Sequence, residues 1–288
     1  MEAVQKPLIK QGWIRAVLYV IGVSVLVYVF QVFGDRIMNQ FNVGTEKGDA
    51  SIANFGILYA LMGLSILVFT WMMRRFIDRK SFNSLGFTWK GYSNEAGLGF
   101  FGALAILGIG SLILVATGYI SFISATFNIN PLLLEIAIMI VVAFVEELLF
   151  RGYILNNLLP SMNKWLALAI SSVLFALFHE ANPEVTVFAI VNILLAGILL
   201  GLNYIFTKNL WFGICFHFAW NYFQGPVLGY DVSGLKLTSI VQQTITGPEV
   251  WTGGPFGFEG SLLCPLLFVV AIGIFAFLFL RRYQSVVD

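Results

Sequence analysis

The sequence predicts an all-α polytopic membrane protein: a single integral-membrane domain over residues 1–288, with about eight transmembrane helices and both termini in the cytoplasm. Hydrophobic residues make up 59% of the 288 positions and charged residues 11%, and the mean hydropathy is +0.87. A soluble domain is roughly half apolar and a quarter charged. Apolar runs of about 20 residues, the length that crosses a bilayer, recur along the chain. Both observations indicate a lipid environment.

Eight apolar segments are predicted to span the bilayer. They cover residues 13–33, 52–73, 96–123, 131–156, 164–179, 183–206, 210–224 and 261–280. Two of the starts carry an asparagine before a proline, Asn130-Pro131 and Asn182-Pro183. This pattern places an N-cap residue ahead of a proline at the first helical position. We therefore expect one helix to begin at Pro131 and another at Pro183.

The basic residues predict the orientation, because cytoplasmic loops carry an excess of Lys and Arg. With eight spans, twelve of the 16 Lys and Arg residues lie in ends and loops on one side of the membrane. Arg36, Lys47 and Lys236 lie on the other side, and Arg151 lies inside the fourth span. This excess places both termini in the cytoplasm, and seven or nine spans would spoil the separation.

Two longer segments are expected outside the bilayer. Residues 74–95 form a basic cytoplasmic connection, and residues 225–260 form an extracytoplasmic loop with Gly-Pro, Ser-Gly and Gly-Gly turn signals. The loop contains Trp251, Phe256 and Phe258. These aromatic residues indicate that it folds back onto the membrane surface.

The composition also argues against some classes of function. The net charge of +1 gives no basis for nucleic-acid binding. The two cysteines, Cys215 and Cys264, lie in apolar runs without the spacing of metal ligands. We interpret them as small buried residues.

The fourth span contains charged residues that need an explanation. Glu146 and Glu147 lie in an otherwise apolar stretch, and Arg151 follows four residues after Glu147. Ionisable side chains in a membrane span are costly and indicate a functional site. Glu147 and Arg151 share a helix face and can form a structural pair. Glu146 points about 100° away, so it is left available for chemistry.

The only two histidines also lie in or at the end of predicted spans. His179 ends the fifth span, whereas His217 lies in the seventh, four residues before Asn221 on the same helix face. At 1.5 Å per residue, Glu146 is roughly 15 Å from the cytoplasmic end of its span and His217 roughly 13 Å. His179 is roughly 22 Å deep, which places it towards the outer side unless its helix is tilted or begins later.

Three short motifs on three spans carry a resemblance to a known family. They are Glu146-Glu147-x-x-x-Arg151, Phe175-x-x-x-His179 and His217-x-x-x-Asn221. In order, spacing and placement they resemble the signature of the CPBP family of intramembrane proteases, which includes CAAX prenyl proteases, bacteriocin-processing enzymes and Abi proteins. Residues 131–224 would then form the catalytic core, and the paired Glu147 and Arg151 would support the site.

The resemblance implies a role for each of the other motif residues. Glu146 would be the general base that activates a water molecule, and His179 would help to hold that water. His217 and Asn221 would form an oxyanion hole. Negative charge develops on the carbonyl oxygen during peptide hydrolysis, and donors aimed at it are worth most in a dry cavity.

A metal-dependent version of the same chemistry remains an alternative. Glu146, His179 and His217 offer the nitrogen and oxygen ligands that zinc takes, with an open position for water. His179-Glu180 begins like a zinc-binding His-Glu-x-x-His motif, but Pro183 stands where the second histidine belongs. A site without metal needs only the residues present, so we favour no cofactor.

The expected function is therefore an intramembrane endopeptidase in the cell membrane, and a bacterial plasma membrane is the expected location. Its partners would be the lipid bilayer and a peptide or lipidated protein substrate. A transporter that uses the charged cluster as a relay is disfavoured, because neither half of the chain repeats the other. A non-catalytic membrane scaffold is the remaining alternative.

Overall fold

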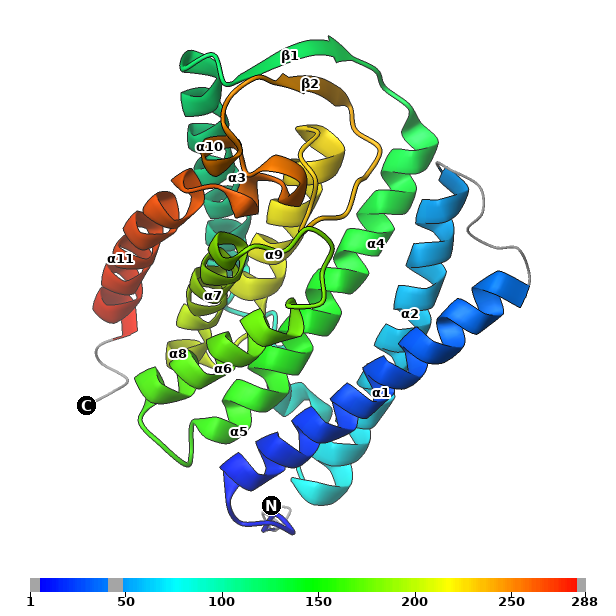
Figure 1. The fold of residues 1–288 in the computed structure, drawn as a ribbon. Helices are drawn as coiled ribbons and strands as arrows, with labels where there is room; N and C mark the ends of the chain where they lie inside the picture. Colours follow the sequence, from blue (N-terminus) through cyan, green and yellow to red (C-terminus); the bar gives the residue numbers. More distant parts are fainter. Residues whose placement is uncertain (1–5, 41–48, 284–288) are drawn as a thin grey trace.

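A computed structural model describes residues 6–40 and 49–283, and it is mostly helical (Figure 1). The main helices are α1 (Gly12–Gln40), α2 (Asp49–Met72), α3 (Ser93–Ala116), α4 (Ile129–Glu147), α6 (Lys164–Phe178), α7 (Val187–Leu202), α9 (Trp211–Tyr222) and α11 (Leu263–Tyr283). Three short helices are α5 (Asn156–Leu158), α8 (Tyr204–Thr207) and α10 (Glu249–Thr252). The two strands are β1 (Ile120–Ala125) and β2 (Val241–Ile245).

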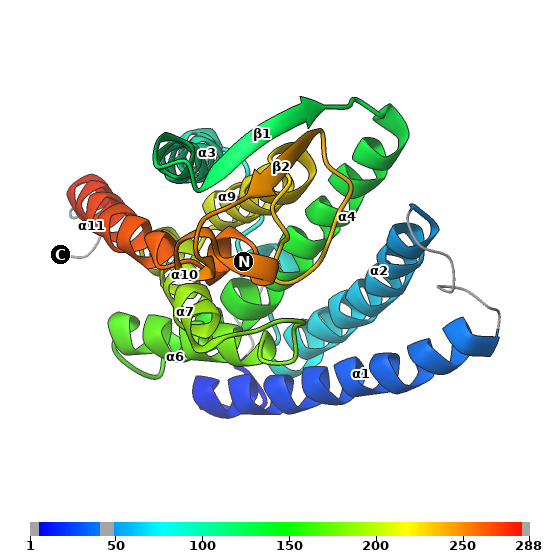
Figure 2. The same ribbon diagram turned by 45° about the horizontal axis from the view of Figure 1, so that its top comes forward.

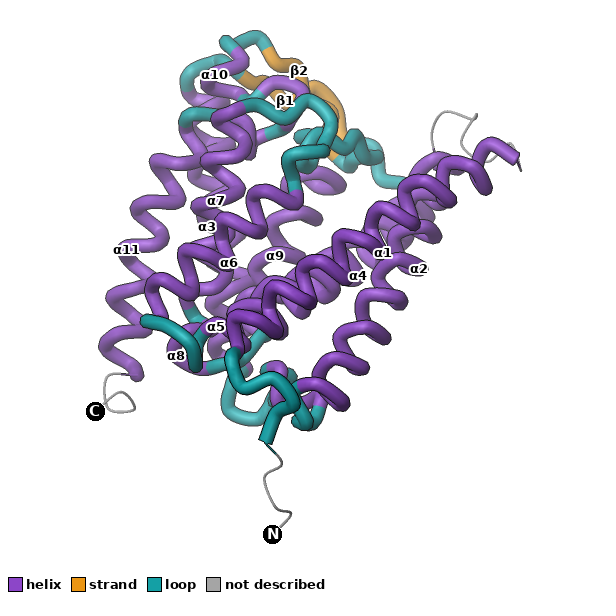
Figure 3. The backbone as a smooth tube through the Cα atoms, turned by 60° about the horizontal axis from the view of Figure 1, so that its bottom comes forward, coloured by secondary structure: helices purple, strands orange, loops and turns teal. Residues whose placement is uncertain are grey.

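Within the described residues, five helical segments are long and apolar enough to cross a membrane. They are Gly12–Gly34, Gly56–Ile77, Ser93–Ala116, Val187–Thr207 and Leu263–Tyr283, with Lys164–Phe178 as a shorter apolar helix. They support a multi-pass membrane protein, whereas the count of eight spans and the orientation stay predictions. The start of α1 and the end of α11 lie at the same end of the bundle, opposite the two strands (Figures 1 and 3).

The predicted third span, 96–123, is wrong at its end. α3 ends at Ala116, where Gly118 adopts a left-handed conformation (φ 72°). The amides of Gly118 and Tyr119 donate to Val115 and Leu114, the closing pattern of a Schellman motif. Residues 120–125 instead form β1, which pairs antiparallel with β2. The all-α prediction thus missed this two-stranded ribbon, which joins segments more than 110 residues apart.

The two predicted helix starts also need correction. α7 begins at Val187, where the Thr186 side chain accepts a hydrogen bond from the amide of Ala189. It does not begin at Pro183, because Glu184 has a positive φ of 55° that interrupts any helix there. α4 begins at Ile129, two residues before the expected Pro131, with Asn128 as its N-cap. Proline is tolerated in this first turn because its missing amide would have no partner inside the helix.

Helix α9 forms the centre of the bundle and packs on α3, α4 and α7. α6 packs on α7, and α11 packs on α7 and α3. α1 and α2 form a pair that flanks the bundle and meets it through α4 and α5 (Figure 2). The long helix around the motif residues is continuous, because a wider π-helical segment, Leu148–Leu155, joins α4 to α5.

The loop over residues 225–260 lies at the same end as the ribbon (Figure 1). Its Phe256 and Phe258 are buried in the core of the protein, and Trp251 is partly buried against that core. Phe258 contacts the rings of Trp220 and Tyr230. These aromatic side chains pack on the helices of the protein itself, and the position of the loop relative to the membrane surface stays a prediction.

Candidate active site

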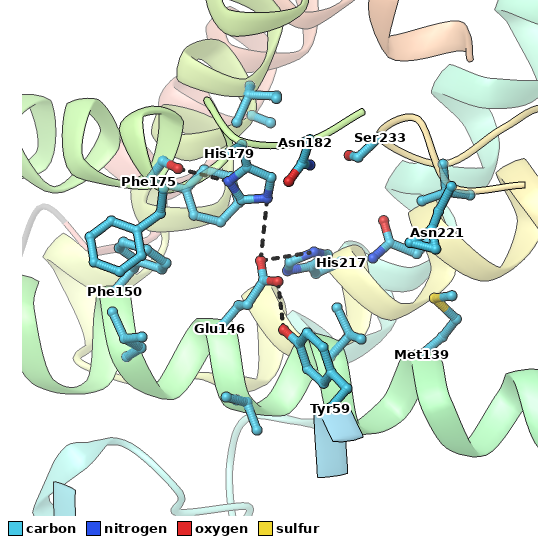
Figure 4. Close-up of a pocket in the computed structure, with 18 of the residues that line it drawn as sticks. Tyr59, Met139, Glu146, Phe150, Phe175, His179, Asn182, His217, Asn221 and Ser233 are labelled. Atoms are coloured by element: carbon cyan, nitrogen blue, oxygen red, sulfur yellow. Dashed lines mark hydrogen bonds and ion pairs between the residues drawn. The ribbon is translucent and has the colours of Figure 1, made fainter. Parts of the chain in front are cut away.

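A cavity of about 440 Å³ opens between α1, α2, α4, α6, α7 and α9 (Figure 4). Its walls are mostly apolar. All four predicted catalytic residues line it, Glu146, His179, His217 and Asn221. The structure thus gathers side chains that are up to 75 positions apart in the sequence into one space.

Glu146 reaches the cavity from the last turn of α4, and its side chain is only 17% exposed. Its two carboxylate oxygens have different surroundings. The Tyr59 hydroxyl on α2 donates a hydrogen bond to Oε1 at 2.8 Å. Oε2 is buried and has no hydrogen-bond partner. A buried acceptor without a partner is unusual and points to a role in binding or reaction.

Both histidines point towards this second oxygen (Figure 4). His179 Nε2 lies 3.7 Å from Glu146 Oε2, and His217 Nε2 lies 3.8 Å from it. The estimate of depth from helical rise placed His179 too far towards the outer side. α6 is inclined to α4 and α9 (Figures 1 and 2), so the distance along its axis overstates the depth of its last residue.

The other ring nitrogen of each histidine is held by an acceptor. His179 Nδ1 lies 2.8 Å from the carbonyl oxygen of Phe175, one turn earlier in α6. His217 Nδ1 lies 3.2 Å from Glu147 Oε1. Carbonyl and carboxylate oxygens only accept hydrogen bonds, so each Nδ1 carries the proton. In a neutral ring the Nε2 that faces Glu146 is therefore an acceptor.

The predicted pair of Glu147 and Arg151 is present, and it also contacts other residues of the site. Arg151 Nη1 lies 2.7 Å from Glu147 Oε1, and both side chains are fully buried. Arg151 Nη2 also donates to the carbonyl of Gly197 at 2.9 Å, which ties α7 to the pair. Because His217 contacts the same Glu147 oxygen, the pair also orients a histidine of the cavity.

The backbone around this pair permits the close approach of α9 to α4. A Cβ atom added at Gly213 would overlap Glu147 Oε2, so a larger residue at this position would displace the carboxylate. Gly213 lies one turn before His217 on α9. The π-helical segment begins at Leu148, directly after Glu147, and such segments are frequent at functional sites.

Asn221 lies beside His217 at the cavity wall, one helical turn further along α9 (Figure 4). The shared face follows from the four-residue spacing, as the sequence predicted. The side chain of Asn221 is 6% exposed. Its amide offers a donor that does not titrate.

Sequence reasoning missed several polar residues of the cavity. Tyr59 comes from the second predicted span, and Ser233 and Glu259 come from the loop over 225–260. Glu259 accepts hydrogen bonds from the Trp220 indole at 2.7 Å and from the Ser233 amide at 3.0 Å. Asn192 on α7 donates to the backbone carbonyl of Glu259 at 2.6 Å. These contacts fasten the loop over one end of the cavity, and no local pattern in the sequence signals them.

Metal binding can be tested against the positions of the donor atoms. Glu146, His179 and His217 supply the types of atom that zinc prefers. Among residues 6–40 and 49–283, however, no group of three or more His, Cys, Asp or Glu side chains is placed to hold a metal ion. The trio does not fit a metal site as it stands, so no step of the chemistry below passes through a metal.

Comparison with known proteins adds an independent observation. Residues 128–223 match the family model described as Type II CAAX prenyl endopeptidase Rce1-like. This match confirms the predicted resemblance. It covers about a third of the chain, from the start of α4 to the end of α9, and includes all three motifs. The Rce1-like family is a family of proteases. No curated protein and no solved structure matches the chain.

Proposed function

We propose that this protein is an intramembrane endopeptidase that uses Glu146 to activate water. The observation that carries the proposal is the convergence of two acceptors, Glu146 Oε2 and His179 Nε2, beside His217 in a mostly apolar cavity. Acceptors that face one another need a donor between them, and a water molecule supplies two hydrogens. The match to a protease family supports the same reaction class.

The first step of the reaction uses two of these acceptors. A water molecule donates one hydrogen to Glu146 Oε2 and the other to His179 Nε2. As the water oxygen attacks the carbonyl carbon of the scissile peptide bond, Glu146 takes the proton. A positioned base of this kind contributes roughly 10²- to 10⁴-fold to the rate.

His217 and Asn221 are placed to stabilise the negative charge that forms on the carbonyl oxygen. Asn221 donates from its amide, and His217 donates from Nε2 after its ring has taken up a second proton from solvent, before the water attacks the carbonyl. Glu146 then passes its proton to the leaving nitrogen as the C–N bond breaks, which restores the carboxylate.

We infer that the substrate is a peptide or lipidated protein in the membrane, and we expect the enzyme in a bacterial plasma membrane. The apolar walls of the cavity and the apolar helices around it support a substrate that reaches the site within the lipid. On this proposal residues 131–224 form the catalytic core, and residues 225–260 form the loop that closes one end.

The membrane and secreted peptides of cells that carry wild-type protein or Glu146→Gln are first compared to find candidate substrates. The test is then cleavage of these peptides by the purified protein in lipid. Glu146→Gln should lower the cleavage rate at least 100-fold, because the amide cannot take a proton. Glu180→Gln is the matched control, since Glu180 is exposed and adjacent to His179. Unchanged cleavage in Glu146→Gln would overturn the role of Glu146, whereas no cleavage by the wild-type protein would favour a transporter or a scaffold.

The dependence on metal is tested separately. Incubation with a strong chelator should leave the cleavage rate unchanged, because the proposed steps use only side chains and water. Metal analysis of the same active preparation checks the result. Stoichiometric zinc that is lost together with activity would overturn the metal-free mechanism and restore Glu146, His179 and His217 as candidate ligands.

A further inference from the structure

Helix α2 contributes one polar side chain that contacts the proposed catalytic base directly. Tyr59 lines the cavity, and its hydroxyl donates to Glu146 Oε1 at 2.8 Å (Figure 4). Tyr59 lies outside residues 128–223, so the match to the Rce1-like family does not include it. The contact joins segments 87 positions apart.

The packing of α2 against α4 places the Tyr59 hydroxyl at this point. Gly56 and Gly63 lie on the same face of α2 as Tyr59, three residues before it and four after it. A Cβ atom at Gly56 would come within 2.7 Å of Ile138, and one at Gly63 within 2.8 Å of Val145. Both contacts are on α4. Small residues on each side of the tyrosine therefore let the two helices approach closely.

The hydrogen bond has a direct consequence for the carboxylate. A glutamate side chain has several rotatable bonds, and an unrestrained carboxylate can turn either oxygen towards the cavity. With Oε1 held by Tyr59, Oε2 is the oxygen that faces His179 and His217. The hydroxyl thus selects which oxygen meets the water and where it lies.

We propose that Tyr59 is a positioning residue for Glu146. It fixes the carboxylate so that one oxygen is bound and the other is aimed at the two histidines. This inference rests on the proposed function of Glu146. It assigns to α2, which lies outside the motif-bearing region, a part in the reaction.

The test is Tyr59→Phe, which removes the hydroxyl and keeps the ring. The expected result is a fall in kcat of roughly tenfold or more with KM nearly unchanged, because a hydrogen bond to a charged group is lost in a step that follows substrate binding. Tyr230→Phe is the matched control. It removes a buried hydroxyl that contacts Ser111 at 3.1 Å, away from the cavity, and should keep wild-type kcat.

A spectroscopic measurement separates this inference from the proposed function. The infrared band of the Glu146 carboxylate is identified as the band that disappears in Glu146→Gln. Tyr59→Phe should shift this band, and Tyr230→Phe should not. If the band shifts but the wild-type protein cleaves no peptide, the proposed function fails and the contact between the two side chains stands. Wild-type kcat together with an unshifted band in Tyr59→Phe overturns the inference.

A second variant covers the case in which Tyr59→Phe does not fold. Gly63→Ala keeps the hydroxyl but pushes α2 away from Val145 on α4. It should lower kcat and shift the same band. Gly97→Ala is its control, because a Cβ atom at Gly97 on α3 meets nothing within 4 Å. Equal kcat values in the two alanine variants would also count against the inference.

Discussion

The continuous helix from α4 to α5 passes two buried groups of charged side chains, and they differ in how well their carboxylate oxygens are satisfied. The first, the Asp78 cluster, consists of Arg15, Arg74 and Asp78. The second, the Glu146 cluster, consists of Glu146, Glu147, Arg151, His179 and His217. Both are mostly removed from solvent, with Glu146 and His179 keeping 17% and 15% of their side chains exposed. Burial alone therefore does not tell them apart.

In the Asp78 cluster each carboxylate oxygen contacts two donors. Asp78 Oδ1 lies 3.2 Å from Arg15 Nε and 3.4 Å from the Tyr153 hydroxyl. Asp78 Oδ2 lies 2.8 Å from Arg74 Nη1 and 3.4 Å from the Asn157 amide. The donors come from α1, the end of α2 and the α4–α5 helix, so the cluster ties these segments together. Arg15 Nε makes its ion pair with Asp78 without a hydrogen bond of good geometry, but no carboxylate oxygen of the cluster is left over.

In the Glu146 cluster, by contrast, carboxylate oxygens are left over, although Arg151 Nε also lacks a partner. One oxygen of Glu146 and one oxygen of Glu147 are buried without a hydrogen-bond partner. With neutral histidines, the cluster carries two negative charges and one positive charge. It therefore favours an added proton or a donor molecule. The comparison teaches that an unsatisfied and unbalanced group, more than a buried one, indicates chemistry.

The largest effect is expected from neutralising the central carboxylate of each cluster. Asp78→Asn leaves two buried arginines without a full counter-ion and should lower the free energy of unfolding by about 3–5 kcal/mol. Glu146→Gln removes a surplus negative charge and should keep or raise stability while it abolishes cleavage. Unfolding by denaturant in detergent or lipid measures both values.

The control for this comparison is Asp231→Asn, because Asp231 is only partly buried and lies outside both clusters. It should change stability by less than about 1 kcal/mol. If Asp78→Asn proves as mild as Asp231→Asn, the distinction between a structural and a reactive cluster does not hold.

An intermediate effect is expected from Gly213→Ala. The added methyl group overlaps Glu147 Oε2, and Glu147 also holds His217 and Arg151. Overpacking of this kind costs about 1–3 kcal/mol, and the displaced His217 should lower cleavage by at least about tenfold. Gly273→Ala on α11 is the control, since a Cβ atom there meets nothing within 4 Å. Unfolding and cleavage are measured for both variants. Equal stabilities and equal cleavage rates in Gly213→Ala and Gly273→Ala would contradict the packing argument.

The smallest effect is expected from Tyr153→Phe in the Asp78 cluster. It removes one long hydrogen bond to an oxygen that still contacts Arg15, so the loss should be about 0.5–1.5 kcal/mol with no change in cleavage. Tyr153→Phe and Tyr59→Phe remove the same hydroxyl group from a tyrosine that contacts one cluster each, so the two variants can be compared directly. A loss of cleavage without a loss of stability in Tyr153→Phe would reverse the assignment of the clusters.

Much of the fold could be predicted because hydropathy is a local property. The apolar runs that form α1, α2, α3, α7 and α11 are visible in the sequence, and each appears as a helix. The ribbon of β1 and β2 was not predicted, because its pairing joins distant segments. The start of α7 was missed because Glu184 adopts a positive φ, which a glutamate in the sequence does not predict.

The candidate site also contains contacts that the sequence predicts and contacts that it does not. Helical spacing alone predicts that Glu147 pairs with Arg151 and that His217 shares a face with Asn221. Spacing cannot give the contact between Glu147 and His217, because it depends on how closely α9 approaches α4. It also cannot give the position of His179, because the inclination of α6 decides how deep that helix ends.

The sequence by itself determined that this chain contains apolar helices of membrane-spanning length and which motif side chains are candidates for its chemistry. Both follow from composition and from the fixed geometry of a helix, which act within one segment. Only the tertiary structure decided that Tyr59 binds one oxygen of Glu146, that the other oxygen faces two histidines, and that Asp78 holds a separate cluster. These contacts arise where helices distant in the sequence pack together, and no pattern within one segment encodes that packing.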